Sequence, residues 1–202
     1  MAIVNFKNAK FVTSALDLSS RPKTNKIYPE VVFVGKSNVG KSSLINALTG
    51  QKIAFSSKKA GKTQLLNYFL VDDSFYLVDA PGWGFTAYGS KLDTTFAEMM
   101  EPYFENNPNL KAVFLLIDGR RGLSNDDKAM FEYLNDIKMP TILVYTKADT
   151  LKQQDKHRIK LEAEGLRATY CLTSNKQYPE EIRRLVVNAI RGKEQIWTIL
   201  GI

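Results

Sequence analysis

Apolar residues along this chain form short runs that alternate with stretches of helical spacing. Three runs are almost continuously apolar, at 31–34, 111–117 and 141–144; the first is also β-branched, and 168–172 is a further strand-like run. Such runs are typical of strands in a parallel sheet that is covered on both faces. Two further strand-like runs, 64–71 and 75–78, flank Asp72-Asp73-Ser74, and this turn chemistry predicts a β-hairpin.

Three stretches with helical spacing lie between these strands or follow the last of them. Their apolar faces comprise Leu44, Ala47 and Leu48 in 43–48; Ala129, Met130, Phe131 and Leu134 in 126–137; and Ile182, Leu185, Val186, Ala189 and Ile190 in 180–191. Ser124 or Asn125 is the expected N-cap of the second helix. The alternation predicts an α/β fold with three layers: a mostly parallel sheet with one antiparallel hairpin strand, and helices on both faces.

The strand predicted at 31–34 leads into a loop with phosphate-binding spacing, and a helix follows it. The loop residues are Gly35, Lys36, Ser37, Asn38, Val39, Gly40, Lys41 and Ser42. Backbone N–H groups and the helix N-terminus can bind phosphates. We expect Lys41 to reach the β- and γ-phosphates and the Ser42 hydroxyl to hold Mg²⁺. The alternative is a glycine-containing turn that binds nothing.

A second segment, Asp79-Ala80-Pro81-Gly82, directly follows the strand predicted at 75–78. At the carboxyl end of that strand, Asp79 can hold a water molecule on Mg²⁺. Gly82 can bring its backbone N–H close to a γ-phosphate, because glycine allows a tight approach. The tetrapeptide alone is a weak signal that often marks only a turn, and its place after the phosphate loop strengthens it.

Two later segments are candidates for contacting the base of a bound nucleotide. In Thr146-Lys147-Ala148-Asp149, Asp149 can accept hydrogen bonds from N1–H and the exocyclic amine of guanine, a pair of donors that adenine lacks. Lys147 is expected to lie along the base, and an exposed helix cap is the alternative role of Asp149. The backbone of Thr173-Ser174-Asn175 is a weaker candidate for contacting the guanine O6.

Together these segments resemble the EngB-type bacterial GTPases, in the class that also contains the Era-like proteins. The resemblance covers nearly the whole chain. Its more specific parts are Gly61-Lys62-Thr63-Gln64-Leu65 and Asp79-Ala80-Pro81-Gly82-Trp83-Gly84-Phe85. It departs from the family pattern at Lys62, Trp83 and Phe85, and the loop after Asn175 also diverges.

The resemblance implies a GTP/GDP switch with Mg²⁺ as cofactor, and it places the nucleotide contacts on the segments named above. Thr63 falls on the threonine of the first switch, which ligates Mg²⁺ when GTP is bound. It is also the only threonine between Thr49 and Thr86, and Ser56 and Ser57 are weaker alternatives. The second switch maps onto 79–88. The residues expected to act in hydrolysis are Lys41, Thr63 and Gly82.

Many small GTPases orient the attacking water with a glutamine, but Trp83 occupies that place here. We therefore expect slow intrinsic hydrolysis. Asn38 resembles the residue that supports a K⁺ ion in related GTPases, and a second cation could neutralise developing charge. The alternative is that Asn38 only stabilises the turn of the loop. Arg120 and Arg121 could stabilise charge in cis, although a surface role is favoured.

The net charge of the chain suggests a polyanionic partner. The chain has 202 residues, a formal net charge of +7 and one cysteine, Cys171, which we assign to the core. RNA, DNA and anionic membrane are candidate polyanions, and a merely basic surface is the alternative. Cations gather near the first switch and on the last helix, at Lys52, Lys58, Lys59, Lys62, Arg183, Arg184, Arg191 and Lys193. His157 is expected on the surface.

The resemblance implies a role in large ribosomal subunit assembly, with ribosomal RNA or a subunit precursor as partner, and in cell division and septation. A P-loop kinase or phosphotransferase is the alternative function. We predict an N-terminal arm or edge strand packed on the domain at 1–29, a GTP-binding domain at 30–193 and a C-terminal tail at 194–202. Finding neither a transmembrane run nor a signal peptide, we expect a cytoplasmic monomer.

Overall fold

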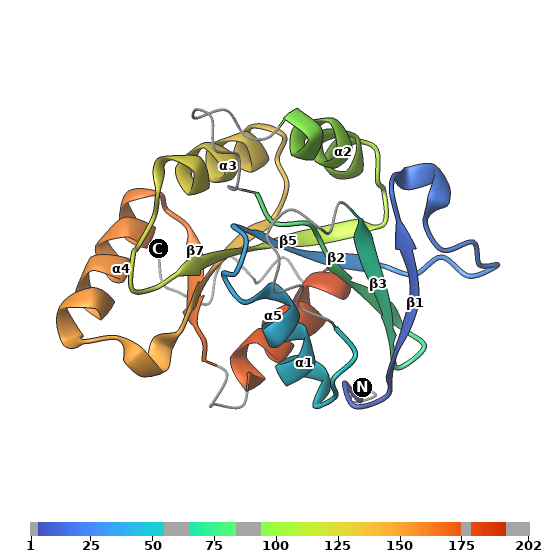
Figure 1. The fold of residues 1–202 in the computed structure, drawn as a ribbon, viewed down its shortest axis with the longest axis horizontal. Coiled ribbons are helices and arrows are strands. Elements are labelled where there is room, and N and C mark those ends of the chain that lie inside the picture. The colour runs from blue at the N-terminus through green and yellow to red at the C-terminus, as the bar shows by residue number, and fades with distance from the viewer. Residues whose placement is uncertain (1–3, 55–64, 84–93, 175–178, 193–202) are drawn as a thin grey trace.

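The computed structural model describes residues 4–54, 65–83, 94–174 and 179–192. Its central feature is a sheet of seven strands in the order β1-β3-β4-β2-β5-β6-β7 (Figure 1). The strands are β1 (Ala9–Ala15), β2 (Glu30–Gly35), β3 (Leu66–Val71), β4 (Phe75–Asp79), β5 (Leu110–Asp118), β6 (Thr141–Thr146) and β7 (Thr169–Leu172). Each apolar run of the sequence lies within or across one of these strands.

Strand β3 pairs antiparallel with both β1 and β4, whereas β4, β2, β5, β6 and β7 are parallel to one another. The turn of the β3–β4 hairpin has positive φ at Asp72 and Asp73, both 49°. Aspartate tolerates this left-handed region, and consecutive left-handed residues suit the twist of a hairpin. The predicted α/β class with one antiparallel hairpin strand is confirmed.

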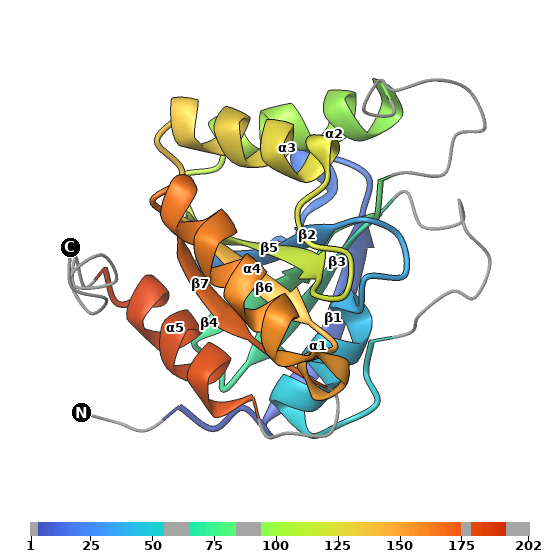
Figure 2. The same ribbon diagram turned by 90° about the vertical axis from the view of Figure 1, so that its left-hand side faces the viewer.

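Helices cover both faces of the sheet, which explains why the parallel strands are apolar throughout (Figures 1 and 2). Contacts in the two core clusters place α2 (Thr94–Glu105), α3 (Asn125–Asp136) and α4 (Gln153–Gly165) on one face. On the other face lie α1 (Lys41–Thr49) and α5 (Glu180–Ile190). Two short 3₁₀ helices, η1 (Leu18–Ser20) and η2 (Ala148–Thr150), complete the described elements.

The predicted helices form with small corrections. Ser124 is the N-cap of α3, since its side chain accepts from the Asp127 N–H and Asp127 reaches back to the Ser124 N–H. Ala129, which we placed on the apolar face of α3, is exposed. In α1, Ile45 is buried and Ala47 only half-buried, so the buried face of this helix includes Ile45 in place of Ala47.

The sequence reading did not predict α2. Pro102 lies inside this helix, and proline removes a backbone donor and usually interrupts a helix. The signal that could have revealed it is the spacing of Phe96, Met100, Tyr103 and Phe104, which are all buried against the sheet. Tertiary packing of this stripe outweighs the local cost of the proline.

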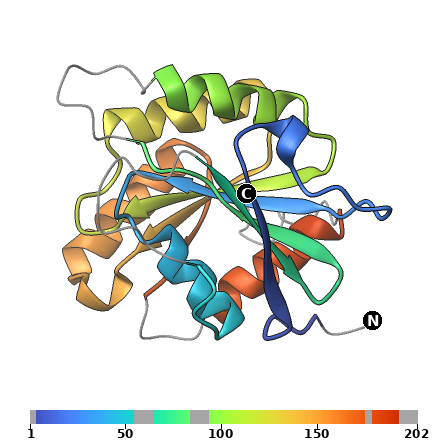
Figure 3. The ribbon, with the colours of Figure 1, turned by 45° about the vertical axis from the view of Figure 1, so that its right-hand side comes forward.

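The N-terminal segment adds an edge to the sheet. Figure 3 shows β1 at this edge, beside the β3–β4 hairpin. Before β1, Phe6 is 5% exposed and packs edge-on against Phe75 at 5.7 Å between ring centroids. The predicted core position of Cys171 and the predicted exposure of His157 are both confirmed. Among the described residues, no helix is both long and apolar enough to cross a membrane.

Candidate nucleotide-binding site

The phosphate loop lies between the carboxyl end of β2 and the start of α1. Gly40 is the N-cap of α1 and has φ +117°, a value that L side chains rarely adopt. Lys41 is only 8% exposed, and its Nζ donates to the carbonyl oxygens of Gly35 at 2.9 Å and Lys36 at 3.3 Å. The lysine therefore points back over its own loop, where phosphate oxygens would take the place of carbonyls.

Gly82 and Trp83 form a wall of this loop. The Ser37 N–H donates to the Trp83 carbonyl at 2.9 Å, and the Ser37 hydroxyl donates to the Gly82 carbonyl at 3.2 Å. A Cβ on Gly82 would lie 2.8 Å from the Ser37 backbone and 2.9 Å from Lys41 Nζ. Glycine is required here because any side chain would enter the space around the lysine ammonium.

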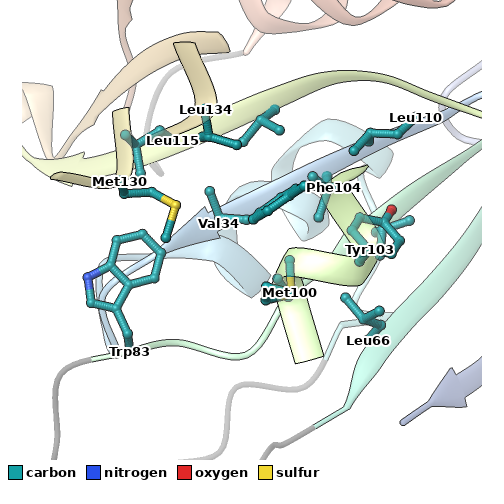
Figure 4. Packing of buried hydrophobic residues seen from close by; sticks show 14 of the residues in the cluster. Val34, Leu66, Trp83, Met100, Tyr103, Phe104, Leu110, Leu115, Met130 and Leu134 are labelled. Atoms are coloured by element: carbon teal, nitrogen blue, oxygen red, sulfur yellow. The ribbon is translucent and has the colours of Figure 1, made fainter. Parts of the chain in front are cut away.

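The Trp83 side chain belongs to the core. It is 2% exposed and packs edge-on against Phe96, with ring centroids 5.2 Å apart. Figure 4 shows the indole beside Met130, next to the cluster that α2 and α3 build on the sheet. The residue at the place of the water-orienting glutamine thus anchors the wall to the core.

Two groups that we assigned to Mg²⁺ lie side by side. The Ser42 hydroxyl donates to Asp79 Oδ2 at 2.8 Å, and among the described residues the buried Asp79 Oδ1 has no hydrogen-bond partner. Burial raises the pKa of Asp79, against the opposing influence of Lys41 and Ser42. Burial likewise lowers the pKa of Lys41, against the influence of Asp79.

Burial outweighs the mutual attraction of Lys41 and Asp79, and among the described residues neither forms a direct ion pair. An anion at Lys41 and a cation at Asp79 would each stabilise the charged form that burial disfavours. The orphaned carboxylate oxygen and the neighbouring hydroxyl supply the hard oxygen donors that Mg²⁺ prefers. The residues present therefore fit an Mg²⁺–phosphate ligand. No group of three or more potential His, Cys, Asp or Glu ligands occurs in the described part of the chain.

The base end of the site lies at the carboxyl ends of β5, β6 and β7. Lys147 adopts a left-handed conformation with φ 62°, and its Nζ contacts Asp118 Oδ2 at 2.6 Å. Asp118 also accepts from the Arg120 guanidinium at 3.0 and 2.7 Å. Burial raises the pKa of Asp118, but the hydrogen bonds from Arg120 and Lys147 outweigh it and hold that pKa below its ordinary value.

Asp118 is a positioning residue that the sequence reading missed. It fixes the lysine ammonium on one side of the base loop, while Asp149 is exposed in η2 on the same loop. The available signal was an aspartate at the end of a buried strand, followed at the second residue by an arginine. We considered Arg120 as a direct charge stabiliser, but its guanidinium is paired with Asp118.

Backbone and hydroxyl contacts join the base end to the phosphate loop. The Thr146 hydroxyl donates to the Val39 carbonyl at 2.9 Å, so this predicted nucleotide residue links the two loops. The Ala148 N–H donates to the Thr173 carbonyl at 2.9 Å, which brings the third predicted segment against the second. Ser174 is buried beside it.

Three more of the predicted site residues can be placed in the structure, and five lie outside the described residues. Asn38 is exposed with φ 62°, a conformation that asparagine tolerates and that agrees with a role in the turn. Lys36 forms an ion pair with Asp126 of α3 at 2.9 Å, and Leu65 is half-buried just before β3. Outside the described residues lie Gly61, Lys62, Thr63, Gln64 and Asn175.

The fold and the site define the class of P-loop GTPases. The sheet is mostly parallel and carries a phosphate loop, a Ser–Asp pair lies at the phosphate end of the site, and a Lys–Asp loop lies at its base end. The family model for 50S ribosome-binding GTPases matches residues 30–147. The chain also resembles two proteins described as probable GTP-binding protein EngB. One, from Lactobacillus acidophilus, is 42% identical over 154 residues, which are 76% of this chain and 78% of that one.

The other, from Geobacillus kaustophilus, is 42% identical over 167 residues, or 81% of this chain and 84% of that one. A crystal structure of a probable GTP-binding protein EngB superposes with a TM-score of 0.66 at 25% identity, covering 81% of this chain and all 100% of the other. The chain belongs to the EngB family of GTP-binding proteins, and as a GTPase it hydrolyses GTP to GDP and phosphate.

Proposed function

We propose that this GTPase is an Mg²⁺-dependent switch that binds the large ribosomal subunit or its precursor according to the bound nucleotide. The observation that carries the Mg²⁺ part is the contact between the Ser42 hydroxyl and the buried Asp79 carboxylate, beside Lys41. Ser42 and Thr63 would ligate the ion directly and Asp79 through a water molecule. The bound ion would supply positive charge at the phosphates. Lys41 and the backbone of Gly82 would bind the γ-phosphate.

Asp149 determines guanine specificity in this proposal. Its exposure on the loop that also carries Lys147, whose ammonium is fixed by Asp118, supports the assignment. Asp149→Asn should exchange guanine for xanthine preference, because the amide can donate to a xanthine carbonyl. We would titrate GDP and XDP by calorimetry. Unchanged GDP affinity in the variant would contradict the guanine assignment and favour the alternative of a P-loop phosphotransferase.

Slow hydrolysis is part of this proposal, and it is supported by the burial of Trp83, which offers no acceptor for orienting a water molecule. A K⁺ ion near Asn38 is the candidate activator. GTP hydrolysis should then be faster in KCl than in NaCl at equal ionic strength, and Asn38→Ala should remove the difference while leaving GDP affinity intact. Equal rates of the unmodified protein in both salts would eliminate the K⁺ hypothesis.

The ribosomal partner is supported by the family description and by the net charge of +7. Tagged protein should sediment with 50S particles more strongly with a non-hydrolysable GTP analogue than with GDP, and less at higher salt. Absence of nucleotide-dependent sedimentation would contradict the switch. The roles in cell division and septation are part of the same proposal, and depletion should produce subunit-assembly defects before division defects.

A further inference from the structure

A groove of about 520 Å³ lies between the N-terminal segment and α5, away from the nucleotide site. In Figure 2 the segment before β1 runs past the end of α5. Its lining includes the cationic side chains of Lys7, Arg184 and Arg191 and the amide side chains of Asn5 and Asn188. None of these residues takes part in the contacts of the nucleotide site described above.

Interactions on the chain itself fix the N-terminal wall of the groove. Phe6 is inserted into the core against Phe75. The Asn5 N–H donates to Asp72 Oδ2 at 3.0 Å, and the Gln51 side-chain amide donates to the Lys7 carbonyl. Because these bonds hold the segment in place, the groove exists before any partner binds, and binding pays little ordering entropy.

Two neighbouring arginines of α5 have different roles. Arg183 donates to the Leu48 carbonyl through Nη2 at 2.6 Å and Nε at 2.9 Å, and it engages Glu180 at 2.6 Å. It therefore caps the C-terminal end of α1. Arg184 is exposed, and among the described residues neither Arg184 nor Lys7 forms an ion pair.

The groove therefore presents a net positive charge to the solvent. Its carboxylate, Glu180, is already engaged by Arg183, so Lys7 and Arg184 keep their attraction for an anionic partner. The groove is also distant from the phosphates. Arg183 binds the last turn of α1, a helix of nine residues that begins at Lys41 and spans about 13 Å.

We infer that this groove binds the phosphate backbone of RNA as an anchor that works alike in the GTP and GDP states. The inference rests on the proposed ribosomal partner and adds the place of contact. Lys7 and Arg184 would pair with phosphates, while the amides of Asn5 and Asn188 can both donate to and accept from ribose hydroxyls. Nucleotide dependence would then come from the switch end of the molecule, not from the groove.

The test compares the double variant Lys7→Gln/Arg184→Gln with the unmodified full-length protein. Each lost phosphate contact on single-stranded RNA should lower the slope of log affinity against log salt by about 0.7, which is about fivefold in affinity at 0.1 M salt. The double variant should therefore bind a labelled 20-nucleotide RNA about 25-fold more weakly, by the same factor with GDP and with a GTP analogue. Its GDP affinity and melting temperature should not change.

Lys128→Gln/Lys156→Gln is the matched control, since it removes two exposed cations from α3 and α4. An equal loss of RNA affinity in this control would assign binding to net charge and overturn the groove. A poly-glutamate peptide that binds the groove as tightly as RNA of equal charge would assign it to an acidic protein.

Binding of 50S particles separates the two proposals. If the unmodified protein binds 50S and the double variant binds equally well, the groove assignment fails and the ribosomal switch stands. If the unmodified protein binds neither 50S particles nor the RNA, both fail. Loss of 50S binding in the double variant, with nucleotide dependence retained in the residual binding, is the result expected here.

Discussion

The phosphate end and the base end of the site use charge in opposite ways. At the phosphate end, Lys41 and Asp79 are buried, and burial shifts the pKa of each towards its uncharged form. At the base end, Asp118 holds Lys147 and Arg120, and those hydrogen bonds lower its pKa despite burial. Among the described residues, the phosphate end thus has no direct ion pair, which a ligand can supply, whereas the base end is already paired within the chain.

This difference indicates where binding energy arises. Charges that are costly to bury become favourable when an anion and a cation enter, so the phosphate end should dominate affinity. The base end, whose lysine is already fixed, should contribute recognition with little further ordering. Four measurements test this contrast, in decreasing order of expected effect.

Trp83→Ala should lower the free energy of unfolding by about 3–5 kcal/mol, the usual cost of removing a large buried ring. The reason is that Trp83 joins the wall of the phosphate loop to the core beneath α2. Urea denaturation measures the change, with Leu161→Ala at a 55% exposed position as control. A loss similar to that of the control would show that the core does not hold this wall.

Lys41→Ala should weaken GDP and GTP binding about a hundredfold or more, since it removes the buried ammonium at the phosphates. The stability of the nucleotide-free protein should not fall, because the lysine is buried at a cost. Fluorescence titration and thermal melting measure the two quantities. GDP affinity within about threefold of the unmodified protein would reverse the ranking of the two ends.

Asp118→Asn should weaken GDP and GTP binding by the same factor, about tenfold, because Lys147 loses its charged anchor. Arg120→Ala is the matched control: its guanidinium is 49% exposed and binds the same carboxylate, so we expect less than about a threefold change. A loss confined to GTP would contradict a positioning role at the base.

The contribution of the Asp118 carboxylate to stability should also depend on pH. Its pKa is lowered from 3.8 in the folded state, so its contribution to stability is present above that value and lost as the pH falls through the folded pKa. The difference in unfolding free energy between the unmodified protein and Asp118→Asn should therefore be full at about pH 7 and smaller at about pH 3. A difference that is constant over this range would contradict the ion pair.

Much of the molecule follows from local sequence patterns. The strand runs, the hairpin turn at Asp72–Asp73 and the cap at Ser124 form as predicted, because periodicity and turn chemistry act over a few residues. Helix α2 was not predicted, because Pro102 disfavours a helix locally and the apolar face of this helix is stabilised by packing on the sheet. Arg183 and Arg184 are adjacent and chemically identical, so sequence alone could not separate cap from surface.

By itself, the sequence determined the class of the protein. The loop 35–42, Asp79 and Asp149 carry chemistry that depends on residue type and on order along the chain, and both are read directly from sequence. Only the tertiary structure decided which side chains meet. It joined Ser42 to Asp79, Asp118 to Lys147 and Thr146 to the phosphate loop, and it buried Trp83. These contacts join segments 29 to 107 positions apart, and only the sheet order brings their strand ends together.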